Sequence, residues 1–223
     1  MSIQRAAAPD RTEPFFAPWL GWVALGEFVG FLIPMGAESL VIAADLPDLP
    51  GAGLLVVAGL GEGAVLGTAM AWRFSRRIPS LNRRRFIVFT AVAAAIAWAV
   101  GMLPVVTAAV WIDWSMPLTV AVGLVLGLVL LASIGVGQWL ELRRHVPHAW
   151  IWVLATAAAW CVGLGAFFMI APPLWNEGQP LILVLVIGAL GAAAMAVAMA
   201  AVTGWAAVRL VRRVLPASMA PLG

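Results

Sequence analysis

Two glutamates stand inside long apolar stretches of this sequence, where an ionised acid is costly. Glu27 lies seven residues before Pro34 and Glu62 lies eleven residues before Arg73, with no basic residue inside either stretch. A charged carboxylate at the centre of a bilayer costs at least about 2.5–3.5 kcal/mol, so such residues usually face a protein interior and mark an ion or substrate pathway. We therefore expect both acids to be protonated, or to bind a cation or the amine of a ligand.

Three roles are open for Glu27 and Glu62 at this point. Each can be a neutral acid that hydrogen-bonds a backbone carbonyl beside neighbouring glycines and holds helices together. The pair can instead bind a proton, a cation or a ligand, and either acid can contact another subunit. The functional hypothesis is that Glu27 and Glu62 bind a ligand or a proton.

No other pattern in the sequence indicates catalysis or a cofactor. The sequence contains no HExxH, no GxSxG and no glycine-rich phosphate loop followed by lysine. Cys161 is the single cysteine, and His145 and His148 have no neighbouring thiol, so we predict no metal site and a solvated loop at the histidines. Glu141 is expected to pair with Arg144 or His145 on a helix surface. We predict a protein that is not an enzyme and binds no nucleic acid.

Composition places the acids in a membrane protein. The chain has 223 residues, of which 64% are hydrophobic and 10% charged, whereas soluble domains have roughly 45–50% and about 25%. The apolar stretches are long enough to span and apolar on every side, which predicts helices and not strands. We expect one all-α domain over 1–223, with spans at about 15–33, 54–72, 86–106, 118–140, 150–170 and 181–210.

Charges between the spans are distributed on one side only. Every basic residue precedes the first span, follows the last, or lies after the second or fourth: Arg5, Arg11, Arg73, Arg76, Arg77, Arg83, Arg84, Arg85, Arg143, Arg144, Arg209, Arg212 and Arg213. The opposite loops are predicted to hold only acids: Glu38, Asp45, Asp48, Asp113 and Glu177. The positive-inside rule then predicts an inner (plasma) membrane protein with both termini cytoplasmic. Binding of anionic lipid by the arginine-rich loop 73–85 is an additional role.

A repeat divides the six spans into three pairs. A tryptophan followed four residues later by an arginine ends each even span, at Trp72 and Arg76, Trp139 and Arg143, and Trp205 and Arg209, with spacings of 67 and 66 residues. We expect these six residues to be membrane-interface anchors. A weaker match sets Trp22 and Pro34 on Trp160 and Pro172, each pair being twelve residues apart. The pattern predicts three tandem helical hairpins in the same orientation.

Only the first hairpin carries acids at these positions. In the alignment just given, Gly165 stands at the position of Glu27, and Val129 and Met195 stand at the position of Glu62. Membrane-spanning helices normally exclude acidic residues. An exception that occurs in only one of three repeated hairpins is a usual sign of function.

Small residues recur at a spacing of four within several spans. They are Gly26 and Gly30, then Gly59, Gly63 and Gly67, then Gly123 and Gly127, and finally Gly188, Ala192, Ala196, Ala200 and Gly204. Because helices in lipid associate by close backbone packing, these ladders predict tight contacts within one chain or between copies. A homo-oligomer or a complex with other membrane subunits is compatible with them.

The segment Gln138 to Arg144, with the helix from Ala149 to Trp160 that follows it, resembles uncharacterised glycine- and tryptophan-rich multi-pass membrane proteins of bacteria. The resemblance implies the topology and implies no activity. Together these patterns predict a small transporter or membrane ligand-binding protein with an intramembrane acidic site at Glu27 and Glu62. The alternative is a non-catalytic accessory or structural subunit of a larger membrane complex.

Overall fold

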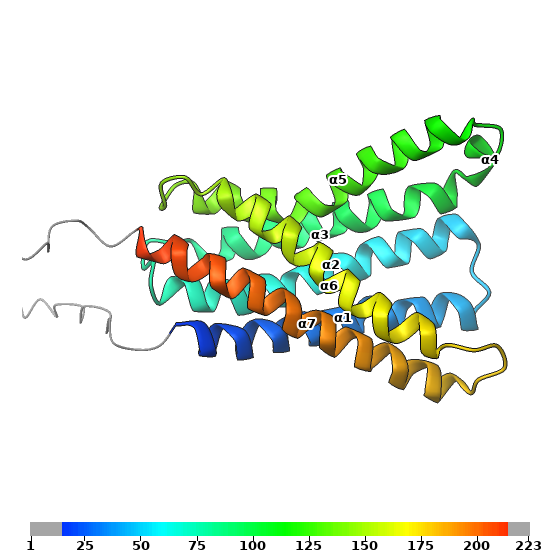
Figure 1. Cartoon of the computed structure of the whole chain (residues 1–223), viewed down its shortest axis with the longest axis horizontal. Coiled ribbons are helices and arrows are strands. Elements are labelled where there is room, and N and C mark those ends of the chain that lie inside the picture. Colours follow the sequence, from blue (N-terminus) through cyan, green and yellow to red (C-terminus); the bar gives the residue numbers. More distant parts are fainter. Residues whose placement is uncertain (1–14, 214–223) are drawn as a thin grey trace, which may run out of the picture.

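The computed structural model describes residues 15–213, and this part of the chain is all-α (Figure 1). Its helices are α1 (Phe16–Ala43), α2 (Asp48–Ser75), α3 (Arg83–Val106), α4 (Ala108–Trp111), α5 (Met116–Leu142), α6 (Ile151–Leu174) and α7 (Leu181–Arg212). All except the short α4 are long and apolar enough to cross a membrane. The protein is therefore an integral, multi-pass membrane protein. Arg5 and Arg11 lie outside the described residues.

The six long helices form a closed ring. Each packs on the next in the order α1, α2, α3, α5, α6 and α7, and α7 packs back on α1. The three hairpins are α1 with α2, α3 with α5, and α6 with α7, all pointing the same way (Figure 1). The predicted all-α fold of three tandem hairpins is confirmed. We call the end that carries the connections 76–82 and 143–150 the arginine end, and the opposite end the acidic end.

Helices at the acidic end extend further than the predicted spans. α1 continues through Pro34 to Ala43, so Glu38 is an exposed helical residue and does not lie in a loop. Asp48 is the first residue of α2, and only Asp45 of this group lies between the two helices. Pro34 has no backbone N–H, so the carbonyl of Gly30 loses its helical hydrogen bond. Membrane helices tolerate such a loss where neighbouring helices pack against them.

The predicted arginine-rich loop is also shorter than expected. Arg73 belongs to α2, and α3 begins at Arg83, so the irregular part of 73–85 is 76–82. Asn82 caps α3, because its side-chain oxygen accepts a hydrogen bond of 3.0 Å from the Arg85 backbone N–H.

Glycines set how closely the ring is packed. A Cβ atom at Gly63 would lie 2.8 Å from the Thr90 carbonyl oxygen on α3, and one at Gly137 would lie 2.6 Å from the Phe89 carbonyl oxygen. Real Cβ atoms do not approach so closely, so α2 and α5 each lie directly on the α3 backbone. By contrast, a Cβ at Gly123 or Gly127 would meet nothing within 4 Å. These two glycines of the predicted ladder make no helix contact within the described chain.

Four aromatic side chains close the arginine end of the ring. Trp19, Phe74, Phe86 and Trp152 come from four different helices and are all fully buried. The Phe74 ring centroid lies 4.7 Å from that of Trp19 and 5.2 Å from that of Trp152, in edge-on contacts. We call these four residues the aromatic cluster. Their contacts fill the interior of the bundle at this end with aromatic side chains.

The aromatic cluster also corrects the predicted alignment of the hairpins. Trp19, Phe86 and Trp152 are spaced by 67 and 66 residues and all three are buried together. Trp22 instead is 47% exposed on the outside of the ring. Trp160 packs inside it, so aligning Trp22 with Trp160 is wrong.

The corrected register changes which residues correspond to the acid of α1. It sets Ala94 and Trp160 at the position of Glu27, in place of Gly165. Ala94 is buried and Trp160 packs against the interior, whereas Gly165 is exposed. All three hairpins therefore direct this position into the bundle, and only the first has an acid there.

Candidate functional site

Glu27 and Glu62 lie close together where α1 packs on α2. Glu27 is 1% exposed and Glu62 is 4% exposed. A Cβ atom at Gly30 would lie 3.1 Å from the Glu62 carbonyl oxygen and 3.4 Å from its Cγ, and Glu27 is one turn along α1 from Gly30. The structure thus brings both sequence-predicted acids to one place inside the bundle.

Glu62 has a specific partner on the neighbouring helix. The indole Nε1–H of Trp98 donates a hydrogen bond of 2.7 Å to Glu62 Oε2. Gly59 lies one turn from Glu62 on α2, and a Cβ atom there would lie 2.9 Å from Trp98 Nε1. The missing side chain at Gly59 therefore gives the indole room to lie against α2 and reach the acid. The sequence contained the signal, a glycine three residues from the acid, but not the identity of the partner.

Glu27 differs from Glu62 because its side chain has no partner. Neither of its carboxyl oxygens has a hydrogen-bond partner among the described residues. A buried polar group left unpaired costs about 1–3 kcal/mol, and a carboxylate costs more. A role in holding helices together would require a hydrogen bond, and none is found. Within the described residues, Glu27 is therefore a buried acid whose carboxyl group makes no hydrogen bond.

A cavity of about 540 Å³ reaches from the acidic end of the bundle toward the two acids. Its wall includes Phe31, Glu38, Trp98, Phe167 and Trp175, from α1, α3, α6 and the residue that follows α6. Trp98 is the residue that donates to the acid on α2, and Phe31 is one turn along α1 from the unpartnered acid. The volume is within the range of small-molecule sites.

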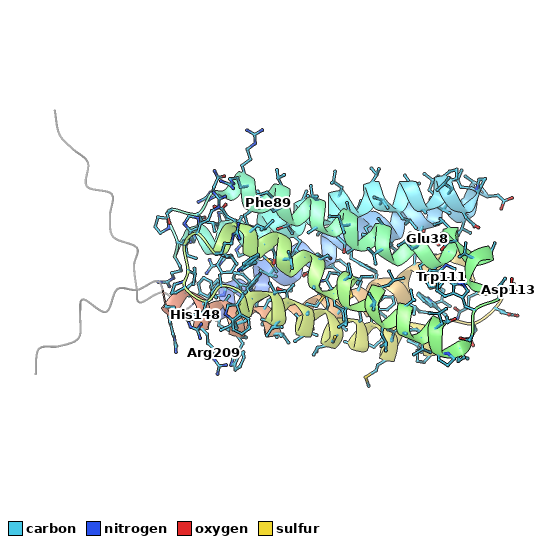
Figure 2. The ribbon with its side chains drawn as sticks, turned by 90° about the horizontal axis from the view of Figure 1, so that it is seen from above. Glu38, Phe89, Trp111, Asp113, His148 and Arg209 are labelled. Atoms are coloured by element: carbon cyan, nitrogen blue, oxygen red, sulfur yellow. The ribbon has the colours of Figure 1, made fainter. Side chains whose placement is uncertain are left out.

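The labelled side chains in Figure 2 show how the two ends differ. Glu38 and Asp113 lie toward one end of the bundle, and His148 and Arg209 lie toward the other. The cavity is thus at the end where the connections carry acids, and the aromatic cluster is at the end where they carry arginines.

The predicted interface anchors form three stacked pairs at the arginine end. The Arg76 guanidinium lies 4.2 Å from the Trp72 ring centroid, that of Arg143 lies 4.7 Å from Trp139, and that of Arg209 lies 3.2 Å from Trp205. All three arginines are exposed. Each pair is a cation–π contact in which the arginine stays accessible to phosphate and water.

Sequence reasoning missed a buried ionic cluster at the arginine end. Glu141 pairs with His145 as predicted, but it is 1% exposed, so the predicted surface location of the pair is wrong. Its Oε1 accepts hydrogen bonds of 2.9 Å from the Asn82 backbone N–H and from His145 Nε2, and its Oε2 lies 3.5 Å from Arg85 Nε. The carboxylate therefore fastens the start of α3 to the end of α5. No spacing in the sequence links Glu141 to Asn82, which lies 59 positions earlier.

His145 is part of this cluster and is not a solvated loop residue. Its Nδ1 lies 3.0 Å from Ser80 Oγ, while its Nε2 contacts Glu141. In serine hydrolases the arrangement is reversed, with the serine at Nε2 and the carboxylate at Nδ1. We interpret the group as a clamp on the connection 76–82.

Within residues 15–213, no group of three or more His, Cys, Asp or Glu side chains is placed to hold a metal ion. Comparison of the chain with known protein families, with curated proteins and with solved structures finds no match.

Proposed function

We propose that this protein is a small transporter or membrane ligand-binding protein whose site is the cavity at the acidic end together with Glu27 and Glu62. The observation that carries the proposal is a fully buried acid without a partner, one turn from the cavity wall. Unsatisfied polar groups at such positions are retained where a ligand or proton satisfies them. The hydrogen bond from Trp98 to Glu62 links the wall to the same acidic pair.

We further propose that the arginine end faces the cytoplasm at the inner (plasma) membrane of a bacterium. The support is the distribution of charge, because basic residues flank the cytoplasmic ends of spans. The cavity then opens on the outer side. The arginine-rich loop 73–85, which includes the exposed Arg76, would then bind anionic lipid headgroups of the cytoplasmic leaflet.

Replacing Glu27 by methionine is expected to raise the stability of the ligand-free protein by about 1 kcal/mol, because an unpaired buried polar group is removed. The matched change Glu62→Met is expected to lower stability by about 1–2 kcal/mol, because the Trp98 indole loses its acceptor. SDS-induced unfolding of the purified protein measures both. A loss of stability in Glu27→Met would show that this acid holds the fold together and would count against a ligand role.

A cysteine placed in the cavity wall tests whether water and solutes reach it. In a Cys161→Ser background, Met102→Cys is expected to react with membrane-impermeant methanethiosulfonates added on the acidic side of the bilayer. Val125→Cys, on a 59% exposed position of α5 that faces away from the cavity wall, is the control and should stay unreactive in hydrocarbon. If neither cysteine reacts with any of these reagents, the proposed site is contradicted.

One surface supports the second candidate, an accessory subunit of a larger membrane complex. The half of α5 nearest the acidic end is exposed and apolar, with Leu124 and Leu128 66% and 67% exposed. A Cβ atom added at Gly123 or Gly127, on the same half, would meet nothing within 4 Å among residues 15–213. If a second membrane polypeptide copurifies with this protein in mild detergent at a fixed stoichiometry, and if Gly127→Leu abolishes the copurification, this candidate is favoured over the first.

A further inference from the structure

The walls of the cavity indicate what class of ligand it takes. Phe31 and Phe167 lie with ring centroids 5.8 Å apart, and Phe167 and Trp175 lie 6.0 Å apart, so aromatic rings form a continuous part of the wall. Trp98 adds a further indole. Faces of aromatic rings carry partial negative charge and attract cations, most strongly where water is excluded.

Charge around the cavity has one sign. Among the described residues that line it, Glu38 is an acid and none is basic. Glu27 and Glu62 lie beyond the Trp98 end of the wall, and the two carboxyl groups share the interior with no arginine or lysine between them and the cavity. Fields of like sign add within a low-dielectric pocket, so a positive ligand is favoured and a negative one is excluded.

The remaining lining excludes a bare metal ion as the natural occupant. Most of it is apolar, including Ile42, Leu55, Met102 and Leu185. Hard cations require six or more oxygen ligands or a shell of retained water. An organic cation needs only one charged end, and its apolar body gains free energy from contact with such a wall.

We propose that the cavity binds a monovalent organic cation with an apolar body, held by the aromatic wall with its charged end at Trp98 and toward Glu62 and Glu27. This inference rests on the function proposed above and specifies the ligand class of the same site. In the empty protein the Trp98 indole lines the cavity and donates its hydrogen bond to Glu62, so the charged end of the ligand lies near Trp98 on the side toward Glu62. Glu27, which has no partner within the described chain, is the second acid of the pair.

The test uses the cavity cysteine Met102→Cys in the Cys161→Ser background, with the protein in lipid nanodiscs. Its reaction rate with the trimethylammonioethyl methanethiosulfonate is divided by its rate with the sulfonatoethyl reagent. The same ratio at an exposed loop cysteine, Asn176→Cys, corrects for intrinsic reactivity. We expect the corrected ratio to be at least tenfold and to fall severalfold in Glu62→Gln and in Glu27→Gln. Glutamine at position 62 keeps an acceptor for the Trp98 indole.

Protection by a probe of the proposed class completes the experiment. Benzyltrimethylammonium should slow labelling of Met102→Cys by tenfold at saturation, and its uncharged isostere neopentylbenzene should not. If labelling is fast, does not depend on the charge of the reagent and is slowed equally by both probes, the cavity still binds ligands but the proposal of a cationic ligand is overturned. No labelling by any reagent would overturn the cavity as a site, and the proposed function with it.

Discussion

Replacing Gly63 by leucine at the α2–α3 interface is expected to destabilise the protein by about 3 kcal/mol or more. A Cβ atom alone would lie 2.6 Å from the Ala94 Cβ and 2.8 Å from both the Ala91 Cα and the Thr90 carbonyl oxygen. The last two are backbone atoms that cannot rotate away. The helices must therefore separate. SDS-induced unfolding and gel filtration in mild detergent measure the loss.

The matched control is Gly123→Leu, the same change in another membrane-spanning helix. A Cβ atom at Gly123 meets nothing within 4 Å, so the variant should unfold like the parent within about 0.5 kcal/mol. Equal destabilisation of the two variants would mean that glycine acts through helix propensity and not through close packing. Destabilisation of Gly123→Leu alone would show that α5 is covered by a partner.

Replacing Glu141 by alanine is expected to cost about 3 kcal/mol and to release the connection 76–82. The change leaves the Asn82 backbone N–H without its acceptor and removes the carboxylate that Arg85 and His145 contact. Unfolding in SDS measures the stability, and limited proteolysis at the arginines of 76–82 measures the release.

Two further variants make this result specific. Glu141→Gln keeps an oxygen for the Asn82 N–H and should lose about 1 kcal/mol. Glu177→Ala removes an exposed acid at the opposite end and should change stability little. An alanine variant as stable and protease-resistant as the parent would contradict the clamp interpretation of Glu141.

The fold could be predicted from sequence because membrane burial leaves so few choices. Long apolar stretches must be helices, and arginines mark one end of each hairpin. What could not be predicted was pairing between distant helices. The 67 and 66 residue spacing found the hairpins through Trp72, Trp139 and Trp205, but only contacts show that α7 returns to α1 and closes the ring.

The candidate site was predicted in part, for a similar physical reason. Glu27 and Glu62 stand out because an acid in hydrocarbon is costly whatever surrounds it. Their environment depends on residues from other helices, so neither Trp98 as a donor nor the cavity beside it could be read from spacing. Glu141 was misjudged because the sequence shows only its neighbours along its own helix, and its burial is set by the segment near Asn82.

The aromatic cluster has an electrical consequence. Once water fills the cavity, its floor lies close to the potential of the solution at the acidic end. We then expect the transmembrane voltage to fall mainly across the part of the bundle that is filled by Trp19, Phe74, Phe86 and Trp152. A unit charge that moves through the whole potential exchanges about 2.3 kcal/mol per 100 mV. Occupancy of the floor by a cation should therefore respond weakly to voltage, while passage beyond the four rings should carry nearly the full dependence. Current or flux measured against voltage thus reports which side of these rings a charge has reached.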